Sequence, residues 1–277
     1  MHLMVMLALS LGMLLVVTLL SMLTSSFLPV GSSAFMLGTQ AVTQILTFMM
    51  PVVIMTSIYY KGQAKEYYRL RFGQETWNMA AAGLVVTLLL VPLNDWLTVW
   101  NDGWDFGWIG EKLREVQKQT EGILEGMLAT DTVGGLLANL FVIALVPAVC
   151  EEVFFRAGIQ NLLQRWFRNP HAAIWLTAVI FSLAHGEVFS FVPRFVLGAL
   201  LGYLYVYGNS ILVNSMAHFI NNAVVVVLYW LSAQGKLGFD PSEPLEFSWI
   251  LTACCTVAAV GVLWVTFFSK KMKNSTV

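Results

Sequence analysis

The sequence predicts an all-α polytopic membrane protein with about eight transmembrane helices. Of its 277 residues, 58% are apolar and only 11% are charged, whereas a typical soluble domain is about 25% charged. No Asp, Glu, Lys or Arg occurs in residues 1–60 or in residues 195–230. Runs of this kind are typical of helices in contact with lipid, and membrane lipid is therefore an expected partner. The net charge of −1 and the lack of a basic stripe give no reason to expect nucleic acid as a partner.

Eight apolar segments are long enough, or nearly long enough, to cross a bilayer, which takes about 20 residues of helix. They are residues 3–23, 39–60, 77–94, 133–166, 172–186, 192–207, 211–231 and 247–268. The fourth is longer than one span, and its arginine-containing end is expected to protrude from the membrane. We divide the chain into an N-terminal three-helix region with an amphipathic loop at 1–131, a core at 132–232, and a C-terminal helix with a basic tail at 233–277.

The placement of Lys and Arg predicts the orientation in the membrane. Basic residues gather in three segments, at 61–71, 165–168 and 270–273, whereas the loops at 95–131 and 240–246 are acidic. With eight spans, the three basic segments and the N-terminus lie on one side. Basic loops face the cytoplasm, so we expect an integral membrane protein with both termini in the cytoplasm.

The acidic loop at 95–131 contains two interfacial features. Tryptophan recurs every four residues, at Trp96, Trp100, Trp104 and Trp108, and tryptophan is enriched at the membrane–water interface. Residues 111–127 then show the apolar spacing of an amphipathic helix. This helix is interpreted as an interfacial anchor, or alternatively as a lid or substrate ramp; the anchor is favoured because no residue in the loop suggests chemistry.

Three ionisable residues follow a long apolar run. No charge occurs in residues 132–150, and then come Glu151, Glu152 and Arg156. Ionisable groups at membrane depth cost roughly 3 kcal/mol each on insertion scales, so they are usually paired or functional. Glu152 and Arg156 are four residues apart and share a helix face in the favourable order for an ion pair. Glu151 is rotated by about 100° and lacks a local partner. We expect Glu152 to be structural and Glu151 to be the free carboxylate, although a purely structural pair is the alternative.

Histidine and asparagine residues appear in two further apolar helices. Glu151 lies 18 residues before Asn169 and His185 lies 16 residues after it. On antiparallel helices with a rise of about 1.5 Å per residue, the two side chains would have nearly equal depth. In the segment 211–231, Asn214, His218 and Asn222 recur every four residues and form one polar stripe. We therefore expect these residues to converge on one cavity within the bilayer.

Two chemistries fit a set of one glutamate, two histidines and one asparagine. Glu151, His185 and His218 could hold a divalent metal such as zinc and leave a position for water. Alternatively, Glu151 and His185 activate a water while His218 and Asn222 donate hydrogen bonds to the developing oxyanion. Both chemistries hydrolyse an amide with activated water.

The polar positions resemble the motifs of the CAAX prenyl protease and bacteriocin-processing family of intramembrane endopeptidases, also called the Abi family. The family motifs E-E-x-x-x-R, F-x-x-x-H and H-x-x-x-N all occur in order, within residues 133–231. The resemblance implies a conical active site inside the membrane and a membrane-associated peptide or protein substrate. It implies a metalloprotease, although some members have been argued to need no metal. The implied catalytic residues are Glu151, His185, His218 and Asn222, supported by Glu152, Arg156, Phe181 and Asn214.

Two other functions are compatible with these residues. A non-catalytic immunity or scaffold protein could retain the fold, but it would have no need of Glu151. A transporter could use a buried Glu–His pair as a proton relay, but the repeated halves that usually accompany broken helices in transporters are not evident. The short loops resemble those of bacterial members, and the expected location is the bacterial inner membrane.

Overall fold

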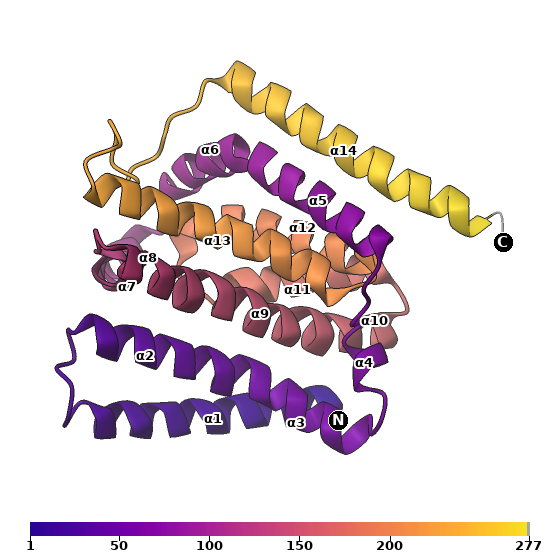
Figure 1. The fold of residues 1–277 in the computed structure, drawn as a ribbon, viewed down its shortest axis with the longest axis horizontal. Coiled ribbons are helices and arrows are strands. Elements are labelled where there is room, and N and C mark those ends of the chain that lie inside the picture. Colours follow the sequence, from indigo (N-terminus) through magenta and orange to yellow (C-terminus); the bar gives the residue numbers. More distant parts are fainter. Residues whose placement is uncertain (276–277) are drawn as a thin grey trace.

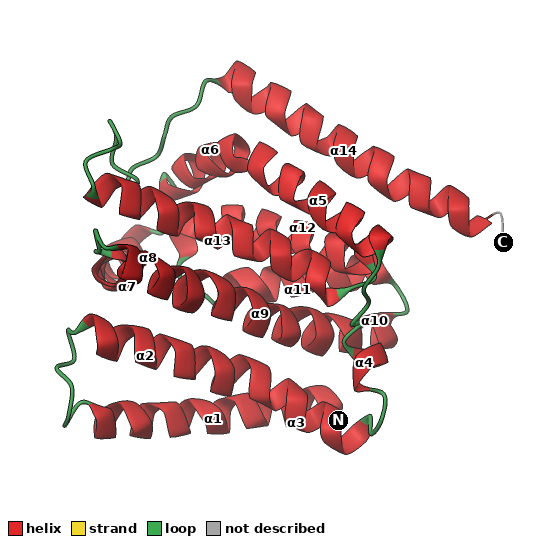
Figure 2. Cartoon of the chain, in the orientation of Figure 1, coloured by secondary structure: helices red, strands yellow, loops and turns green. Residues whose placement is uncertain are grey.

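The computed structural model describes residues 1–275, with side-chain surroundings for residues 1–267, and all regular secondary structure in this part is helical (Figure 2). This confirms the predicted all-α fold. The N-terminal helices are α1 (His2–Thr24), α2 (Ser33–Thr43), α3 (Met50–Tyr59), α4 (Ala64–Tyr67), α5 (Gln74–Leu89), α6 (Val91–Asp102) and α7 (Gly110–Leu128). The others are α8 (Val133–Asn139), α9 (Val146–Glu152), α10 (Asn161–Phe167), α11 (Pro170–Leu183), α12 (Phe191–Gly208), α13 (Ile211–Ala233) and α14 (Trp249–Ser275).

Three wider π-helical segments continue these helices without a break. They are η1 (Gln44–Met49) between α2 and α3, η3 (Leu140–Leu145) between α8 and α9, and η4 (Val153–Gln160) between α9 and α10. Two short 3₁₀ turns complete the list, η2 (Gly107–Ile109) and η5 (Val188–Ser190). Segments of π-helix occur often at functional sites, and η4 begins directly after Glu152.

The described part of the chain contains six helical stretches long and apolar enough to cross a membrane, or seven if the bent pair α5–α6 counts as one. The expected number of eight is therefore not confirmed. The predicted helix at 77–94 is bent by 46° after Leu90, where Pro92 in the first turn of α6 cannot continue the hydrogen bonding of α5. The predicted segment at 172–186 is α11, which has only 14 residues.

The helices form a layered bundle with α9, α11, α12 and α13 in its interior (Figure 1). Helix α13 packs against α9 on one side and against α5 on the other, and α11 packs against α12. The hairpin of α1 with α2 and α3 covers the α9 side, while α14 packs on α5 and α6. The residues of the predicted core are therefore enclosed by helices from both terminal regions.

The basic connection between α3 and α5 and the acidic loop that contains α7 lie at opposite ends of the bundle. The start of α1 and the end of α14 lie at the end that carries α4 and α10, and the α1–α2 connection, α6 and α7 lie at the opposite end (Figure 1). The first end carries the basic residues of the α3–α5 connection together with Arg165 and Arg168. The opposite end carries α7, which confirms the amphipathic helix predicted at 111–127.

The turn between α10 and α11 is encoded locally. Arg168 ends α10 in the left-handed conformation, and the side chain of Asn169 accepts hydrogen bonds from the backbone N–H groups of His171 and Ala172. Pro170 follows at the first position of α11, where its missing N–H costs nothing. This turn makes α11 antiparallel to the helix that carries Glu151 and Glu152.

Candidate active site

The carboxylate of Glu152 is the centre of a buried polar cluster between η4, α9 and α13. Arg156 Nε donates to Glu152 Oε2 at 3.0 Å, and Asn214 Nδ2 donates to the same oxygen. His218 Nδ1 lies 3.0 Å from Glu152 Oε1. All four side chains are at most 3% exposed. The predicted pairing of Glu152 with Arg156 is confirmed, and the carboxylate also fixes two side chains of the neighbouring helix.

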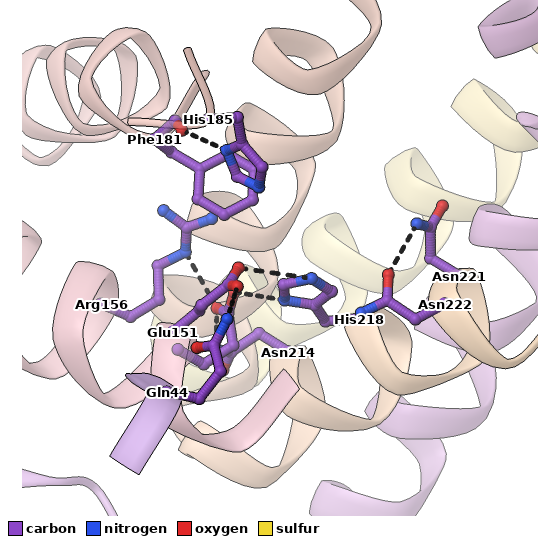
Figure 3. A network of polar contacts seen from close by, with 10 residues as sticks. Gln44, Glu151, Arg156, Phe181, His185, Asn214, His218, Asn221 and Asn222 are labelled. Carbon is purple, nitrogen blue, oxygen red and sulfur yellow. Dashed lines mark hydrogen bonds and ion pairs between the residues drawn. The ribbon is translucent and has the colours of Figure 1, made fainter. Parts of the chain in front are cut away.

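The partners of His218 determine its tautomer. A carboxylate oxygen only accepts hydrogen bonds when it is ionised, so the proton between His218 and Glu152 belongs to His218 Nδ1. The other ring nitrogen, Nε2, faces Glu151 and lies 3.8 Å from its Oε2. This separation is too long for a direct hydrogen bond. Glu152 thus orients His218 so that Nε2 and the Glu151 carboxylate face each other (Figure 3).

Glu151 has a second partner that the sequence did not reveal. Gln44, the first residue of η1, donates from Nε2 to Glu151 Oε1 at 2.9 Å (Figure 3). Gln44 is 6% exposed, and its Oε1 is buried without a hydrogen-bond partner among the described residues. In the sequence, Gln44 is an amide within an apolar segment, but Gln40, one turn earlier, is an amide in the same segment. Only the packing of η1 on α9 distinguishes the two.

His185 lies just beyond the end of α11. Helix α11 ends at Leu183, so His185 sits half-buried in the following turn. Its Nδ1 lies 2.8 Å from the carbonyl oxygen of Phe181; a carbonyl can only accept, so Nδ1 carries the proton and Nε2 has a free lone pair. Within residues 1–267, His185 makes no hydrogen bond or ion pair with Glu151. The two side chains therefore have other direct partners, and the water bridge expected between them stays a prediction.

The ring of Phe181 connects the two histidines. Its centroid lies 4.9 Å from that of His185 and 5.9 Å from that of His218, with edge-to-face geometry in both cases. The guanidinium carbon of Arg156 lies 5.4 Å from the same centroid. Phe181 is 1% exposed. It therefore holds both imidazoles next to the Glu152 cluster, which gives a physical reason for a phenylalanine at this position.

Asn222 lies one turn beyond His218 on α13 and outside the carboxylate cluster. Its Oδ1 accepts a hydrogen bond from Asn221 Nδ2 at 3.2 Å, which leaves its own amide N–H groups available as donors. Asn222 is half-buried, and Figure 3 shows it apart from Glu151. The structure thus brings Glu151, Glu152, Arg156, Asn214 and His218 together, and it places His185 and Asn222 at the edge of this group.

The possible metal ligands do not form one tight group. Among the described residues, no group of three or more His, Cys, Asp and Glu lies close enough to be recognised as a metal site. Glu151 and His218 face each other, and the bond of His185 Nδ1 to the Phe181 carbonyl leaves His185 Nε2 free. The zinc set that the sequence left open stays a prediction, and the chemistry below is derived from the protein side chains and water alone.

Residues 133–224 match the family described as Type II CAAX prenyl endopeptidase Rce1-like. Within this part, the chain is similar to CAAX prenyl proteases. The matched stretch contains all three polar motifs, and it excludes Gln44. Neither a curated protein nor a solved structure matches the chain. This similarity and the helices long and apolar enough to cross a bilayer together support an integral membrane protein.

Gln44 gives a first test of the site geometry. Replacing Gln44 with Leu is expected to lower turnover about tenfold to a hundredfold, since a hydrogen bond to a charged group contributes about 1.5–3 kcal/mol. The melting temperature should change little, because Leu also removes the unpartnered Oε1. The measurement is the cleavage rate beside the Gln40→Leu variant, which removes an amide one turn away. Equal rates for both variants would show that Gln44 does not position Glu151.

Proposed function

We propose that this CAAX-type protease hydrolyses peptide bonds of membrane-associated proteins or peptides with a water molecule activated by Glu151. The observation that carries the proposal is the facing pair of Glu151 Oε2 and His218 Nε2, 3.8 Å apart in a buried site. Every other member of the cluster positions this pair: Gln44 holds Glu151, and Glu152 holds His218. General-base catalysis requires an ionised group within hydrogen-bond reach of the water, and Glu151 is the carboxylate that Arg156 leaves unpaired.

The charges of the cluster favour a doubly protonated His218. Glu151 and Glu152 carry two negative charges, and Arg156 carries one positive charge. A second proton on His218 makes the buried group neutral overall, which avoids an uncompensated charge at membrane depth. In this form, Nε2–H is a donor directed toward the space beside Glu151. It can stabilise a negative oxygen that develops there.

The reaction then follows from these roles. Glu151 takes a proton from water while the water oxygen bonds to the carbonyl carbon of the scissile peptide. His218 Nε2–H and the free amide of Asn222 donate to the resulting oxyanion. When the C–N bond breaks, Glu151 returns its proton to the leaving amine. The lone pair on His185 Nε2 accepts the second hydrogen of the attacking water, so His185 orients the nucleophile.

The proposal is tested with the protein purified in detergent and a panel of peptides with lipid-modified and unmodified C-termini. The wild-type protein is expected to cleave a member of the panel, and the Glu151→Ala variant is expected to leave it intact. Equal cleavage by both would assign the activity to a contaminant. A folded wild-type protein that binds these peptides but cleaves none would favour the scaffold function. Metal analysis of the same sample tests whether Glu151, His185 and His218 hold zinc.

The orientation in the membrane is part of the proposal. We propose that the end with α4, α10 and both termini faces the cytoplasm of a bacterial cell, because basic residues gather there. Reporter domains fused after Ser269 and inserted at Gln117 are expected to report opposite sides of the membrane. A cytoplasmic signal from both fusions would contradict this topology.

A further inference from the structure

Two cavities meet at Arg165, at the end of the bundle where α4, α10 and the N-terminus lie (Figure 1). The first, here called the polar cavity, has a volume of about 230 Å³ and is lined by Glu66, Tyr67, Arg69, Asn161, Gln164 and Arg165. The second, the apolar cavity, has a volume of about 760 Å³ and a mainly apolar lining with three polar side chains, formed by Met1, His2, Leu3, Met4, Tyr60, Leu162, Leu163, Arg165 and Trp166. A charged compartment thus shares Arg165 with a mainly apolar one.

The polar cavity carries an excess of positive charge. Arg69 donates to the side-chain oxygens of Asn161 and Gln164 at 3.4 and 3.2 Å. Arg165 donates to the Tyr60 hydroxyl at 2.6 Å. Within the described residues, neither arginine forms an ion pair with a carboxylate. Glu66 also lines the cavity, but it is exposed and is one negative charge against two positive charges.

Two further groups of the polar cavity have hydrogen atoms to donate and no acceptor. The Tyr67 hydroxyl and Gln164 Nε2 are both buried without a hydrogen-bond partner in the described part of the chain. Tyr67 is only 5% exposed. Burial raises the pKa of Tyr67, so its hydroxyl keeps its proton and remains a donor. Buried polar groups are normally satisfied, and two unmatched donors next to two arginines point to an acceptor with negative charge.

We propose that these cavities bind one anionic phospholipid, with its phosphate in the polar cavity and an acyl chain in the apolar cavity. Arg69 and Arg165 donate to the phosphate oxygens, for which arginine is well suited. The enclosed hydroxyl of Tyr67 and the amide of Gln164 turn to the same oxygens when the lipid binds. The apolar cavity extends from Arg165 along α1 and α10, where a chain attached to the phosphate would run. Basic pockets between membrane helices are known lipid headgroup sites. The site lies outside the catalytic cluster and does not depend on the proposed hydrolysis.

The sharpest test is Tyr67→Phe. Its hydroxyl has no partner within the described residues, so its removal breaks no protein contact and leaves the lipid-free melting temperature unchanged. Binding of phosphatidylglycerol should nevertheless weaken about tenfold, the effect of one hydrogen bond to a charged group. The measurement is the rise in melting temperature of the delipidated protein during titration with phosphatidylglycerol, since a ligand of the native state stabilises it. Tyr68→Phe is the matched control: that hydroxyl contacts Thr56 and does not line the cavity.

Further titrations identify the ligand class. Phosphatidylcholine with the same acyl chains should bind at least tenfold more weakly in the same titration. Water-soluble glycerol phosphate should not change the melting temperature measurably. Arg165→Gln should weaken phosphatidylglycerol binding, whereas Arg168→Gln, which removes the same charge outside both cavities, should not. Equal affinity of the Tyr67→Phe and Tyr68→Phe variants would overturn the proposal. So would equal stabilisation by phosphatidylcholine, or full stabilisation by glycerol phosphate, which would indicate a site for a free anion.

Discussion

Replacing Glu151 with Gln is expected to lower the rate of peptide cleavage at least about a hundredfold, the usual contribution of a positioned acid–base group. Gln has nearly the same volume as Glu, and its carbonyl oxygen can still accept the hydrogen bond from Gln44. It cannot take a proton from water. Glu152 keeps its ion pair with Arg156, and His218 can release its second proton once Glu151 is neutral, so the buried group stays neutral and folding should be almost unaffected. The measurements are the single-turnover cleavage rate and the melting temperature in the same detergent.

The matched comparison for this result is His185→Gln, which removes the water-orienting lone pair and keeps the general base. We expect its rate to fall less than that of Glu151→Gln. A Glu151→Gln protein that cleaves at the wild-type rate would show that this carboxylate is not the base. A Glu151→Gln protein that fails to fold would show that Glu151 is structural.

Replacing Glu152 with Gln is expected to destabilise the protein by about 3–5 kcal/mol, the typical effect of removing one partner of a buried ion pair. Three donors converge on the two oxygens of Glu152: those of Arg156, Asn214 and His218. An amide presents one oxygen and one NH₂ group, so at least one of these donors would then face another donor. Arg156, which is fully buried, would also lose its counter-charge. The melting temperature and the yield of folded protein should therefore fall, along with activity.

The double variant Glu152→Gln with Arg156→Met separates two effects on stability: that of the unpaired Arg156 charge and that of the hydrogen bonds lost from Asn214 and His218. Removing the unpaired guanidinium should restore part of the lost stability, although Asn214 and His218 remain without their carboxylate. Activity should stay low, because His218 no longer has the acceptor that fixes its tautomer. Stability of Glu152→Gln equal to that of the wild type would show that the two glutamates have been assigned the wrong way round.

The sequence by itself determined the features that depend on one helix. Apolar runs predicted the all-α membrane fold, and the four-residue spacing of Glu152 and Arg156 predicted their ion pair, because helix geometry alone places such residues on one face. The same periodicity placed Asn214, His218 and Asn222 on one side of α13. It did not predict that α5 bends at α6 or that residues 153–160 form a wider helix.

Only the tertiary structure decided which side chains meet across helices. Gln44 reaches Glu151 over a separation of 107 residues, and no local pattern distinguishes it from Gln40. His218 contacts Glu152 as well as Glu151, and His185 turns to the Phe181 carbonyl instead of Glu151. These contacts depend on how far each helix continues, where it widens, and how it is rotated against its neighbours. Those quantities arise from packing of whole side chains, whereas the spacing of residues fixes only the contacts within a single helix.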